Sequence, residues 1–196
     1  MYDLVYCYPN SDVLMNNFNI RDQRVLSRIE QRFTAFRLLE LADKTEFGDF
    51  DIKHFCDIHQ YIFQDIYAWA GDFRTVDIAK GNLFCKAEFL NTEAERVFQE
   101  ILLRRDFAGS KTEDAAKILA YVLSELNALH PFREGNGRTQ REFIRQLAFV
   151  NGYHIDYTLI SQEEMIAASR ASFLCEYGPM EELMQRCIKV IAKFLL

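Results

Sequence analysis

Apolar residues recur three to four positions apart along most of this chain, which is the spacing of an amphipathic helix. Between residues 21 and 42 they include Val25, Ile29, Phe33 and Phe36, and this spacing predicts a helix. The same pattern predicts further helices at about residues 51–71, 87–105, 112–130, 137–151, 161–174 and 179–196. The chain is therefore expected to fold mainly as helices.

Residues 73–86 interrupt the helical pattern. Their sequence, FRTVDIAKGNLFCK, places β-forming residues on both sides of Lys80-Gly81-Asn82, which is typical of a small hairpin. An exposed hairpin suits recognition, because its extended edge can pair with the backbone of a partner. The alternative is a simple connector between two helices, and the pattern leaves both interpretations open.

The composition supports an all-α fold class. The 196 residues fit one domain, with 17 Phe and 9 Tyr for a core but only 8 Gly and 3 Pro. A sandwich or barrel of many strands would need more Gly and Pro in its turns. No repeat or low-complexity linker divides the chain, so residues 1–196 are expected to form a single domain.

Charge and cysteine content indicate a cytoplasmic protein. The net charge of −6 gives no broad basic surface, so no direct binding of nucleic acid is expected. The five cysteines are scattered, which favours reduced thiols over a disulfide framework. The N-terminus lacks the pattern of a signal peptide and no apolar run is long enough to span a bilayer, so no membrane association is expected.

The segment NALHPFREGNGRTQREF, residues 127–143, carries the candidate chemistry. Pro131 disfavours helical geometry at His130, so the helix before it should end there. Phe132 is apolar within a polar loop and is expected to anchor the loop in the core. The glycines on either side of Asn136 permit left-handed geometry, which turns successive backbone N–H groups toward an anion at a helix N-terminus.

Charged residues in the same segment indicate a site for phosphate transfer. Arg138 and Arg141 are three residues apart, so both can reach one anion. Glu134 and phosphate oxygens together could hold Mg²⁺. His130 can take a proton from a hydroxyl nucleophile near neutral pH. By contrast, His54 and His59 are spaced poorly for one metal ion, and they are expected at the surface and at the edge of the core, respectively.

The stretch HPFREGNGR, residues 130–138, resembles the signature of the Fic domain family at every position. Three further segments also look typical of that family, namely SDVLMNNFNIRDQ, IHQYIFQDIYAWAGDFRTVDIAKGN and ASFLCEYGPMEELM. The resemblance implies the Fic fold, a compact helical bundle with a small β-hairpin flap beside the active-site loop. It also implies an N-terminal helical extension at about residues 1–50 and a Fic core at about residues 51–196.

The resemblance implies that the protein transfers AMP from ATP to a hydroxyl side chain of a target protein and releases pyrophosphate. His130 would be the catalytic base, Glu134 would hold Mg²⁺, and Arg141 would contact the γ-phosphate. The family assigns nucleotide binding to Phe132, Arg133, Glu134, Gly135, Asn136, Gly137, Arg138 and Arg141. It assigns target docking to a flap made of Ile78, Ala79, Lys80, Gly81, Asn82 and Leu83.

Two other functions stay open within this resemblance. Doc-type relatives, which resemble kinases of the γ-phosphate, place Lys where this chain has Gly137, so AMP transfer is favoured. A catalytically idle module that binds nucleotide or a partner is the second alternative, and the intact His130 and Glu134 argue against it. Some family members transfer other phosphate-linked groups, such as phosphocholine.

The resemblance also bears on regulation and partners. Many Fic proteins carry an inhibitory glutamate that meets the second arginine, which is Arg141 here. No matching motif is found, since Gln31 and Leu38 occupy the positions where the glutamate should fall. Glu176 has the required spacing from Ser172 but lies too close to the motif. A small antitoxin is therefore expected to supply the glutamate, as for a bacterial toxin whose targets could include DNA gyrase or topoisomerase IV.

Overall fold

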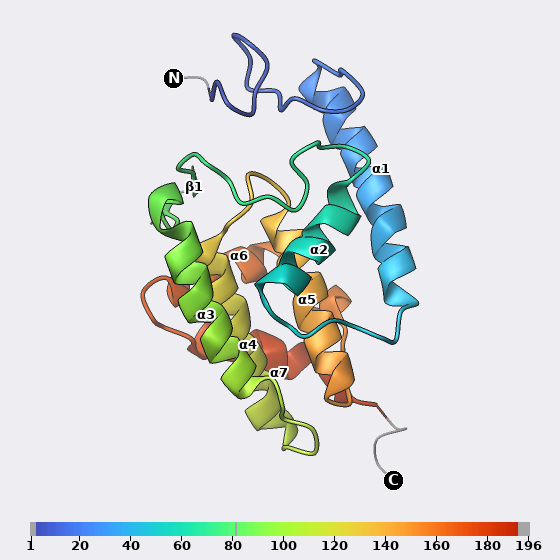
Figure 1. Ribbon diagram of the computed structural model, residues 1–196. Coiled ribbons are helices and arrows are strands. Elements are labelled where there is room, and N and C mark those ends of the chain that lie inside the picture. Colours follow the sequence, from blue (N-terminus) through green and yellow to red (C-terminus); the bar gives the residue numbers. More distant parts are fainter. Residues whose placement is uncertain (1–2, 81, 192–196) are drawn as a thin grey trace.

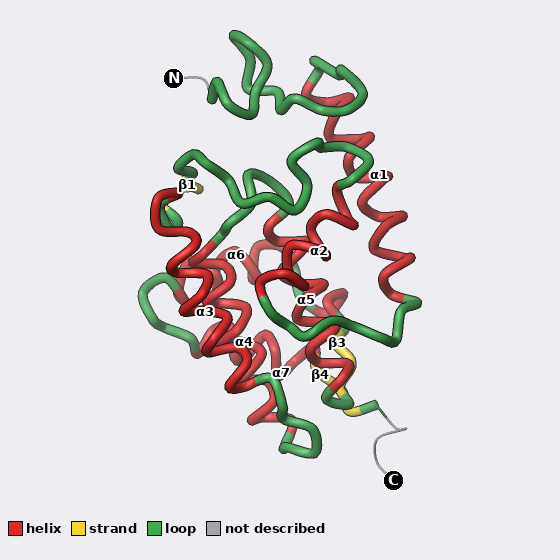
Figure 2. The backbone as a smooth tube through the Cα atoms, in the orientation of Figure 1, coloured by secondary structure: helices red, strands yellow, loops and turns green. Residues whose placement is uncertain are grey.

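The computed structural model describes residues 3–80 and 82–191, and most of this part of the chain is helical (Figures 1 and 2). The helices are α1 (Gln23–Ala42), α2 (Ile52–Phe63), α3 (Leu90–Arg104), α4 (Thr112–Leu129), α5 (Asn136–Val150), α6 (Gln162–Ser172) and α7 (Gly178–Cys187). Two short 3-10 turns, η1 (Ala87–Phe89) and η2 (Tyr157–Leu159), precede α3 and α6. The expected all-α fold class is confirmed.

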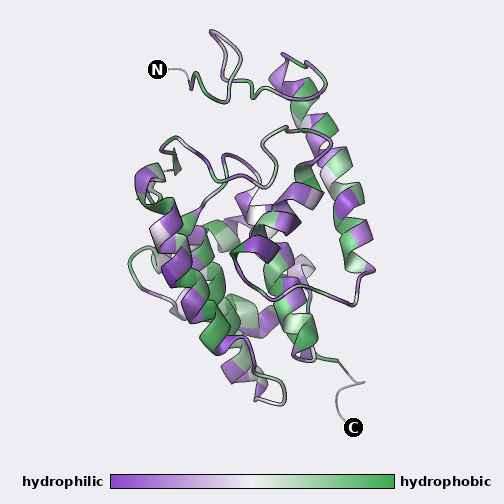
Figure 3. Cartoon of the chain, viewed as in Figure 1, coloured by the Kyte–Doolittle hydropathy of each residue, from purple (hydrophilic) through white to green (hydrophobic). Residues whose placement is uncertain are grey.

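Helix α4 lies at the centre of the bundle. It packs against α3, α5 and α7, while α2 packs against α1 and α5. Its buried face includes Ala115, Leu119, Val122 and Leu126, each fully buried, and their spacing is that of one helical stripe. Figure 3 shows hydrophobic and hydrophilic residues side by side along α1, α2 and α3, as expected for helices with one face toward the core.

Polar side chains define where several helices begin. The carboxylate of Asp22 accepts hydrogen bonds from the first N–H groups of α1, and that of Asp51 accepts one from the N–H of His54 in α2. Ser161 and Glu164 form a reciprocal capping box at the start of α6. Each cap satisfies backbone donors that have no acceptor within the helix.

The predicted hairpin is confirmed as a pair of two-residue antiparallel strands, β1 (Ala79–Lys80) and β2 (Asn82–Leu83). It stands at one end of the molecule, beside the start of α3 (Figure 1). Gly81, which lies between Lys80 and Asn82 in the sequence, is outside the described residues. The backbone N–H of Phe84 donates to the carbonyl of Ile78 at 3.4 Å, which continues the pairing below the strands.

Two predicted helix ends were wrong. Helix α2 ends at Phe63 instead of Gly71, and the chain then folds through turns. Helix α7 ends at Cys187 rather than continuing toward residue 196. Residues 192–196 of the predicted helix lie outside the described part of the chain. Ile188–Val190 forms β4, which pairs antiparallel with β3 (Tyr153–Ile155). β-branched residues at 188 and 190 favour this extended pairing over continued helix.

Helix α1 lies along one side of the molecule, opposite α3 (Figure 1). It buries few side chains, chiefly Leu26, Thr34 and Leu41. Within residues 3–80 and 82–191, no helix combines the length and the apolar composition that crossing a bilayer requires.

Candidate active site

His130 follows the last residue of α4 and has left-handed backbone geometry, with φ 46° and ψ 57°. Its N–H still donates to the carbonyl of Leu126, so it closes the helix. Nδ1 lies 3.2 Å from the carbonyl oxygen of Asn127. Because a carbonyl can only accept, Nδ1 carries the proton, and the lone pair of the neutral ring lies on Nε2. The ring of Phe84 stacks on the imidazole with centroids 3.7 Å apart.

The loop after His130 is closed by Asn136. The side-chain amide of Asn136 donates to the carbonyl of Phe132 at 2.7 Å and accepts from its N–H at 2.9 Å. The ring of Phe132 is fully buried and stacks on His59 with centroids 3.8 Å apart. Phe132 and the side chain of Asn136 therefore stabilise the loop from inside.

The two glycines of the loop, Gly135 and Gly137, differ in backbone conformation and in the space around them. Gly135 has φ +86°, and a Cβ there would lie 2.3 Å from the ring of Phe63. Gly137 lies within α5 and has no positive φ, so the expected left-handed geometry was wrong at this position. A Cβ at Gly137 would come 3.3 Å from Nη1 of Arg141. Gly135 is thus required by conformation and space, whereas Gly137 leaves room beside an arginine.

The start of α5 presents backbone donors to the cavity. The N–H groups of Arg138 and Thr139 both donate to the carbonyl of Gly135 at 3.1 Å. The N–H groups of Asn136 and Gly137 come before the first acceptor in the helix, so an anion can take their hydrogen bonds. The dipole of α5 adds partial positive charge at the same end.

The two arginines of the motif lie in different surroundings. Arg141 lines the cavity, and burial lowers its pKa. Its guanidinium forms no ion pair with a carboxylate in residues 3–80 and 82–191. Arg138 donates to a carboxylate oxygen of Glu30 at 2.6 Å and lies over the ring of Phe63. Arg141, unlike Arg138, therefore has a positive charge that could pair with an anionic ligand in the cavity.

The carboxylate of Glu134 lies between the backbone of its own loop and the guanidinium of Arg138. Its Oε1 accepts the N–H of Gly135 at 2.9 Å and lies 3.7 Å from Nη2 of Arg138. No group of three or more metal-binding side chains exists in the described part of the chain. A single carboxylate at a cavity with phosphate-binding donors fits Mg²⁺ that binds together with a nucleotide, because the phosphates would supply the other ligands.

Arg133 points away from the other motif residues. Its Nε donates to a carboxylate oxygen of Asp3 at 2.7 Å, and its Nη2 contacts the sulfur of Cys7. It is absent from the lining of the cavity. The structure therefore places Arg133 where it ties the loop to the N-terminal segment.

The cavity has a volume of about 730 Å³ and is shared between the motif, α4, α6 and η2. Motif residues form one wall, and Tyr157, Ser161, Met165 and Ser169 belong to the other. Phe84 and Phe173 stand at its edge near the hairpin, and both also line a second, smaller groove. The cavity is thus large enough for a nucleotide.

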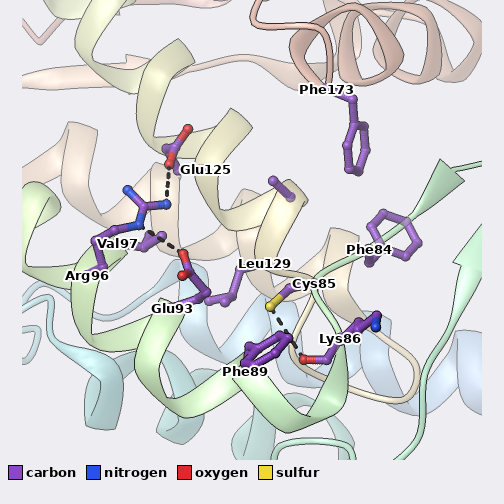
Figure 4. A pocket seen from close by; sticks show the side chains of 11 residues that line it. Phe84, Cys85, Lys86, Phe89, Glu93, Arg96, Val97, Glu125, Leu129 and Phe173 are labelled. Atoms are coloured by element: carbon purple, nitrogen blue, oxygen red, sulfur yellow. Dashed lines mark hydrogen bonds and ion pairs between the residues drawn. The ribbon is translucent and has the colours of Figure 1, made fainter.

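The second groove, of about 440 Å³, adjoins the active site on the hairpin side (Figure 4). Arg96 of α3 lies between Glu93 and Glu125 and forms ion pairs with both, at 2.9 and 3.3 Å. Phe84 and Phe173 face each other at the opposite end of the view.

His59 supports the loop in a way that the sequence analysis missed. It is fully buried, its Nε2–H donates to the carbonyl of Glu134 at 3.0 Å, and its Nδ1 accepts the N–H of Gly71 at 2.8 Å. Burial lowers the pKa of His59 to about 4. His54 is buried as well, so its expected surface position was wrong. The spacing of His59 from Phe55 and Phe63, four residues each way, was the available signal.

The comparison with protein families decides the identity of the fold. Residues 49–148 match the model of the Fic/DOC family. The chain belongs to the Fic/DOC family. The matched range contains the whole loop from His130 to Arg141 together with α2, the hairpin, α3 and α4.

Similar proteins agree with this membership. The chain is 40% identical over 182 residues to "Protein adenylyltransferase VbhT" of Bartonella schoenbuchensis, matching 92% of this chain but spanning only 38% of VbhT. It is 38% identical over 184 residues to "Probable protein adenylyltransferase y4lH" of Sinorhizobium fredii, covering 93% of this chain and 94% of y4lH. A solved Fic domain of Bartonella quintana with bound ADP superposes with a TM-score of 0.90 at 28% identity, covering 97% of both chains.

Proposed function

We propose that this protein transfers AMP from ATP to a hydroxyl side chain of a target protein. The enzyme class follows from relatives named as protein adenylyltransferases, which match over nine-tenths of this chain. The observation that carries the proposal is geometric. His130, with its proton on Nδ1, borders the same cavity as the N-terminus of α5 and the half-buried Arg141.

The reaction follows from these positions. The target hydroxyl gives its proton to Nε2 of His130, and its oxygen forms a bond to the α-phosphorus of ATP. The bond from that phosphorus to the oxygen bridging to the β-phosphate breaks, and pyrophosphate leaves with the electron pair. Backbone N–H groups of Asn136 and Gly137, with Arg141, stabilise charge on the phosphates.

Glu134 takes part by holding a metal ion with the nucleotide. A bound Mg²⁺ would neutralise phosphate charge, with Glu134 and phosphate oxygens among its ligands. The hydrogen bond from the N–H of Gly135 to Oε1 of Glu134 restricts where this carboxylate lies. The hairpin binds the target protein, since the short strands β1 and β2 offer backbone groups that can pair with an extended target segment.

The position of the label on ATP tests the reaction. We expect α-labelled ATP with Mg²⁺ to label a protein target, and γ-labelled ATP to leave it unlabelled. Purified DNA gyrase and topoisomerase IV are the first targets to try, followed by a bacterial lysate. The His130→Ala variant is expected to lose labelling. Transfer of the γ-label would show a kinase, and Gly137, in place of the lysine of Doc-type relatives, is the observation against that outcome.

The same site suggests how the enzyme is controlled. A toxin controlled by a separate cytoplasmic antitoxin fits the lack of any ion pair at Arg141 among the described residues, because a partner's glutamate would occupy that place. Glu176 is exposed and does not line the cavity. We expect the purified protein to be active alone and Glu176→Gln to leave its rate unchanged. An inactive protein that Glu176→Gln activates would overturn this regulation.

A further inference from the structure

Arg74 is the largest of the fully buried side chains, with 2% of its surface exposed. It lies between α2 and β1, near the start of the segment predicted to form the hairpin, where its sequence context indicated no role for it. No carboxylate in the described residues forms an ion pair with it, and burial lowers its pKa. A buried charge without a counterion is unfavourable unless its donors are satisfied. The hydrogen-bond acceptors of Arg74 therefore show what it is there to hold.

The guanidinium donates to three backbone carbonyls, two at the base of the hairpin and one at the end of α4. Nε donates to His130 at 3.0 Å, and Nη1 donates to Val76 at 2.7 Å. Nη2 donates to the carbonyl of Cys85. Val76 and Cys85 flank the hairpin on its two sides, so one side chain joins both of its ends to the catalytic histidine.

Further contacts run between the same two segments. The backbone N–H of Arg74 donates to the carbonyl of Pro131 at 2.8 Å, and that of Cys85 donates to Ala128 at 3.2 Å. Phe84 stacks on His130 with an interplanar angle of 14°. The base of the hairpin and the end of α4 are thus joined by backbone bonds, by a ring contact and by the guanidinium.

The backbone of His130 explains why this support is needed. A residue with a side chain in left-handed geometry is strained, and such strain persists only where surrounding contacts hold it. In this geometry the carbonyl of His130 points at Nε of Arg74. The guanidinium therefore holds the same peptide unit that carries the imidazole.

We propose that Arg74 is a positioning residue that fixes the distance between the hairpin and His130. This inference rests on the proposed function, in which the hairpin holds the target segment and His130 takes its proton. A shift of the hairpin would move the target hydroxyl away from the base without moving the nucleotide. Arg74 does not line the nucleotide cavity, so its loss impairs transfer to protein more than binding of nucleotide.

The Arg74→Lys variant separates the planar fork from the charge. Lysine keeps the positive charge and a flexible stem, but it cannot donate to three carbonyls in the fixed geometry of a guanidinium. We expect Arg74→Lys to reduce the rate of AMP transfer about a hundredfold, as for misplaced reacting groups. The Kd for the ATP analogue AMPPNP is expected to stay within about threefold of wild type. Arg105→Lys is the matched control, because Arg105 is partly exposed and its guanidinium donates to a single backbone carbonyl, that of Asp49.

Hydrogen exchange tests the coupling independently of catalysis. In the wild-type protein, the backbone amides of Cys85 and His130 should exchange through the same opening of the structure. Both amides should then give the same free energy of opening and the same dependence of that free energy on denaturant. Arg74→Lys should raise exchange about tenfold in both segments and leave the amides of α7 unchanged. The inference would be overturned if the amides of Cys85 and His130 opened with different free energies in the wild type. It would also be overturned if Arg74→Lys transferred AMP at the wild-type rate. If the wild type transfers no AMP while the two amides still open together, the proposed function fails and the coupling stands.

Discussion

Side chains that bond to backbone groups hold the active-site loop. Asn136 binds both backbone groups of Phe132, and His59 donates to the carbonyl of Glu134. Arg74 donates to the carbonyl of His130. The motif residues are therefore positioned through the main chain of the loop, and changes at the supporting side chains are expected to affect the cavity without contacting it.

Gly135→Ala tests the packing below the loop. The new Cβ would meet the ring of Phe63 at 2.3 Å in a left-handed backbone, so we expect a loss of about 3 kcal/mol in the free energy of unfolding. Gly109→Ala is the matched control, because Gly109 has φ +76° but no atom within 4 Å of its Cβ. The control should lose only about 1 kcal/mol, the conformational part. Equal losses in urea unfolding would mean that Phe63 does not restrict this site.

The pH dependence of stability tests the burial of His59. Its folded-state pKa of about 4 lies below the ordinary 6.5, so the unfolded state binds the proton more readily. The contribution of neutral His59 to the free energy of unfolding is therefore fully present above pH 6.5, and it is lost as the pH falls toward 4. We expect His59 to account for about 1 kcal/mol of the loss between pH 7.5 and 5.5. Burial also lowers the pKa of His54, which adds to the wild-type loss.

The His59→Gln variant isolates this contribution in denaturant titrations at the two pH values. The variant is expected to lose less stability on acidification than wild type does. His154→Gln, which changes an exposed histidine, should keep the wild-type dependence. A His59→Gln protein with an unchanged pH dependence would contradict the account.

The sequence could reveal the motif residues but not the side chains that hold them. His130, Glu134 and Arg141 lie within twelve residues, and each has a residue type that suits phosphate chemistry. Arg74 and its acceptor His130 are 56 residues apart, and His59 is 75 residues from Glu134. Contacts of such sequence separation depend on the tertiary fold, so no local pattern reports them.

At the scale of elements, α1 and α5 are joined by the ion pair of Glu30 with Arg138. Thr34 adds a hydrogen bond to the same guanidinium at 3.2 Å, and the hydroxyl of Tyr67 donates to Glu30. These polar contacts add to the packing of Leu26 and Leu41 of α1 against the core. They also fix where Arg138 stands relative to the start of α5.

Glu30→Gln tests this docking, since it removes the charge but keeps the shape. We expect the free energy of unfolding to fall by about 1–2 kcal/mol, because a hydrogen bond to a charged partner is weakened. The KM for ATP should change several-fold, because Arg138 is no longer held in place. Glu95→Gln on α3, where the glutamate is exposed, serves as the control in thermal unfolding and kinetics. Identical behaviour of the two variants would show that α1 does not position Arg138.

Elements with local signals were predicted well, and those with distant partners were not. The hairpin follows from the turn at residues 80–82, and α4 from one long apolar stripe. Strand β4 pairs with β3, which lies more than thirty residues earlier in the chain. From the local sequence alone, Ile188 and Val190 are therefore assigned to the preceding helix. Pairing with a distant strand overrode the local helical pattern.

For the whole molecule, nucleotide binding should be visible as added stability. A ligand that binds only the folded state at a hundred times its Kd stabilises it by about 2.7 kcal/mol. We expect AMPPNP with Mg²⁺ to raise the thermal midpoint of the wild type. Arg141→Ala, which removes a guanidinium that lines the cavity, should lose most of this shift. Lys53→Ala should keep it, because Lys53 does not line the cavity and is exposed in its ion pair with Asp57.

The ratio of products tests the central claim most directly. With a purified target, the amount of AMP joined to protein and the amount of pyrophosphate released should be equal in each reaction of the wild type. Both should disappear together in His130→Ala, because the same imidazole takes the proton in the step that expels pyrophosphate. Release of ADP with phosphate joined to the target, or equal AMP transfer by His130→Ala, would contradict the account.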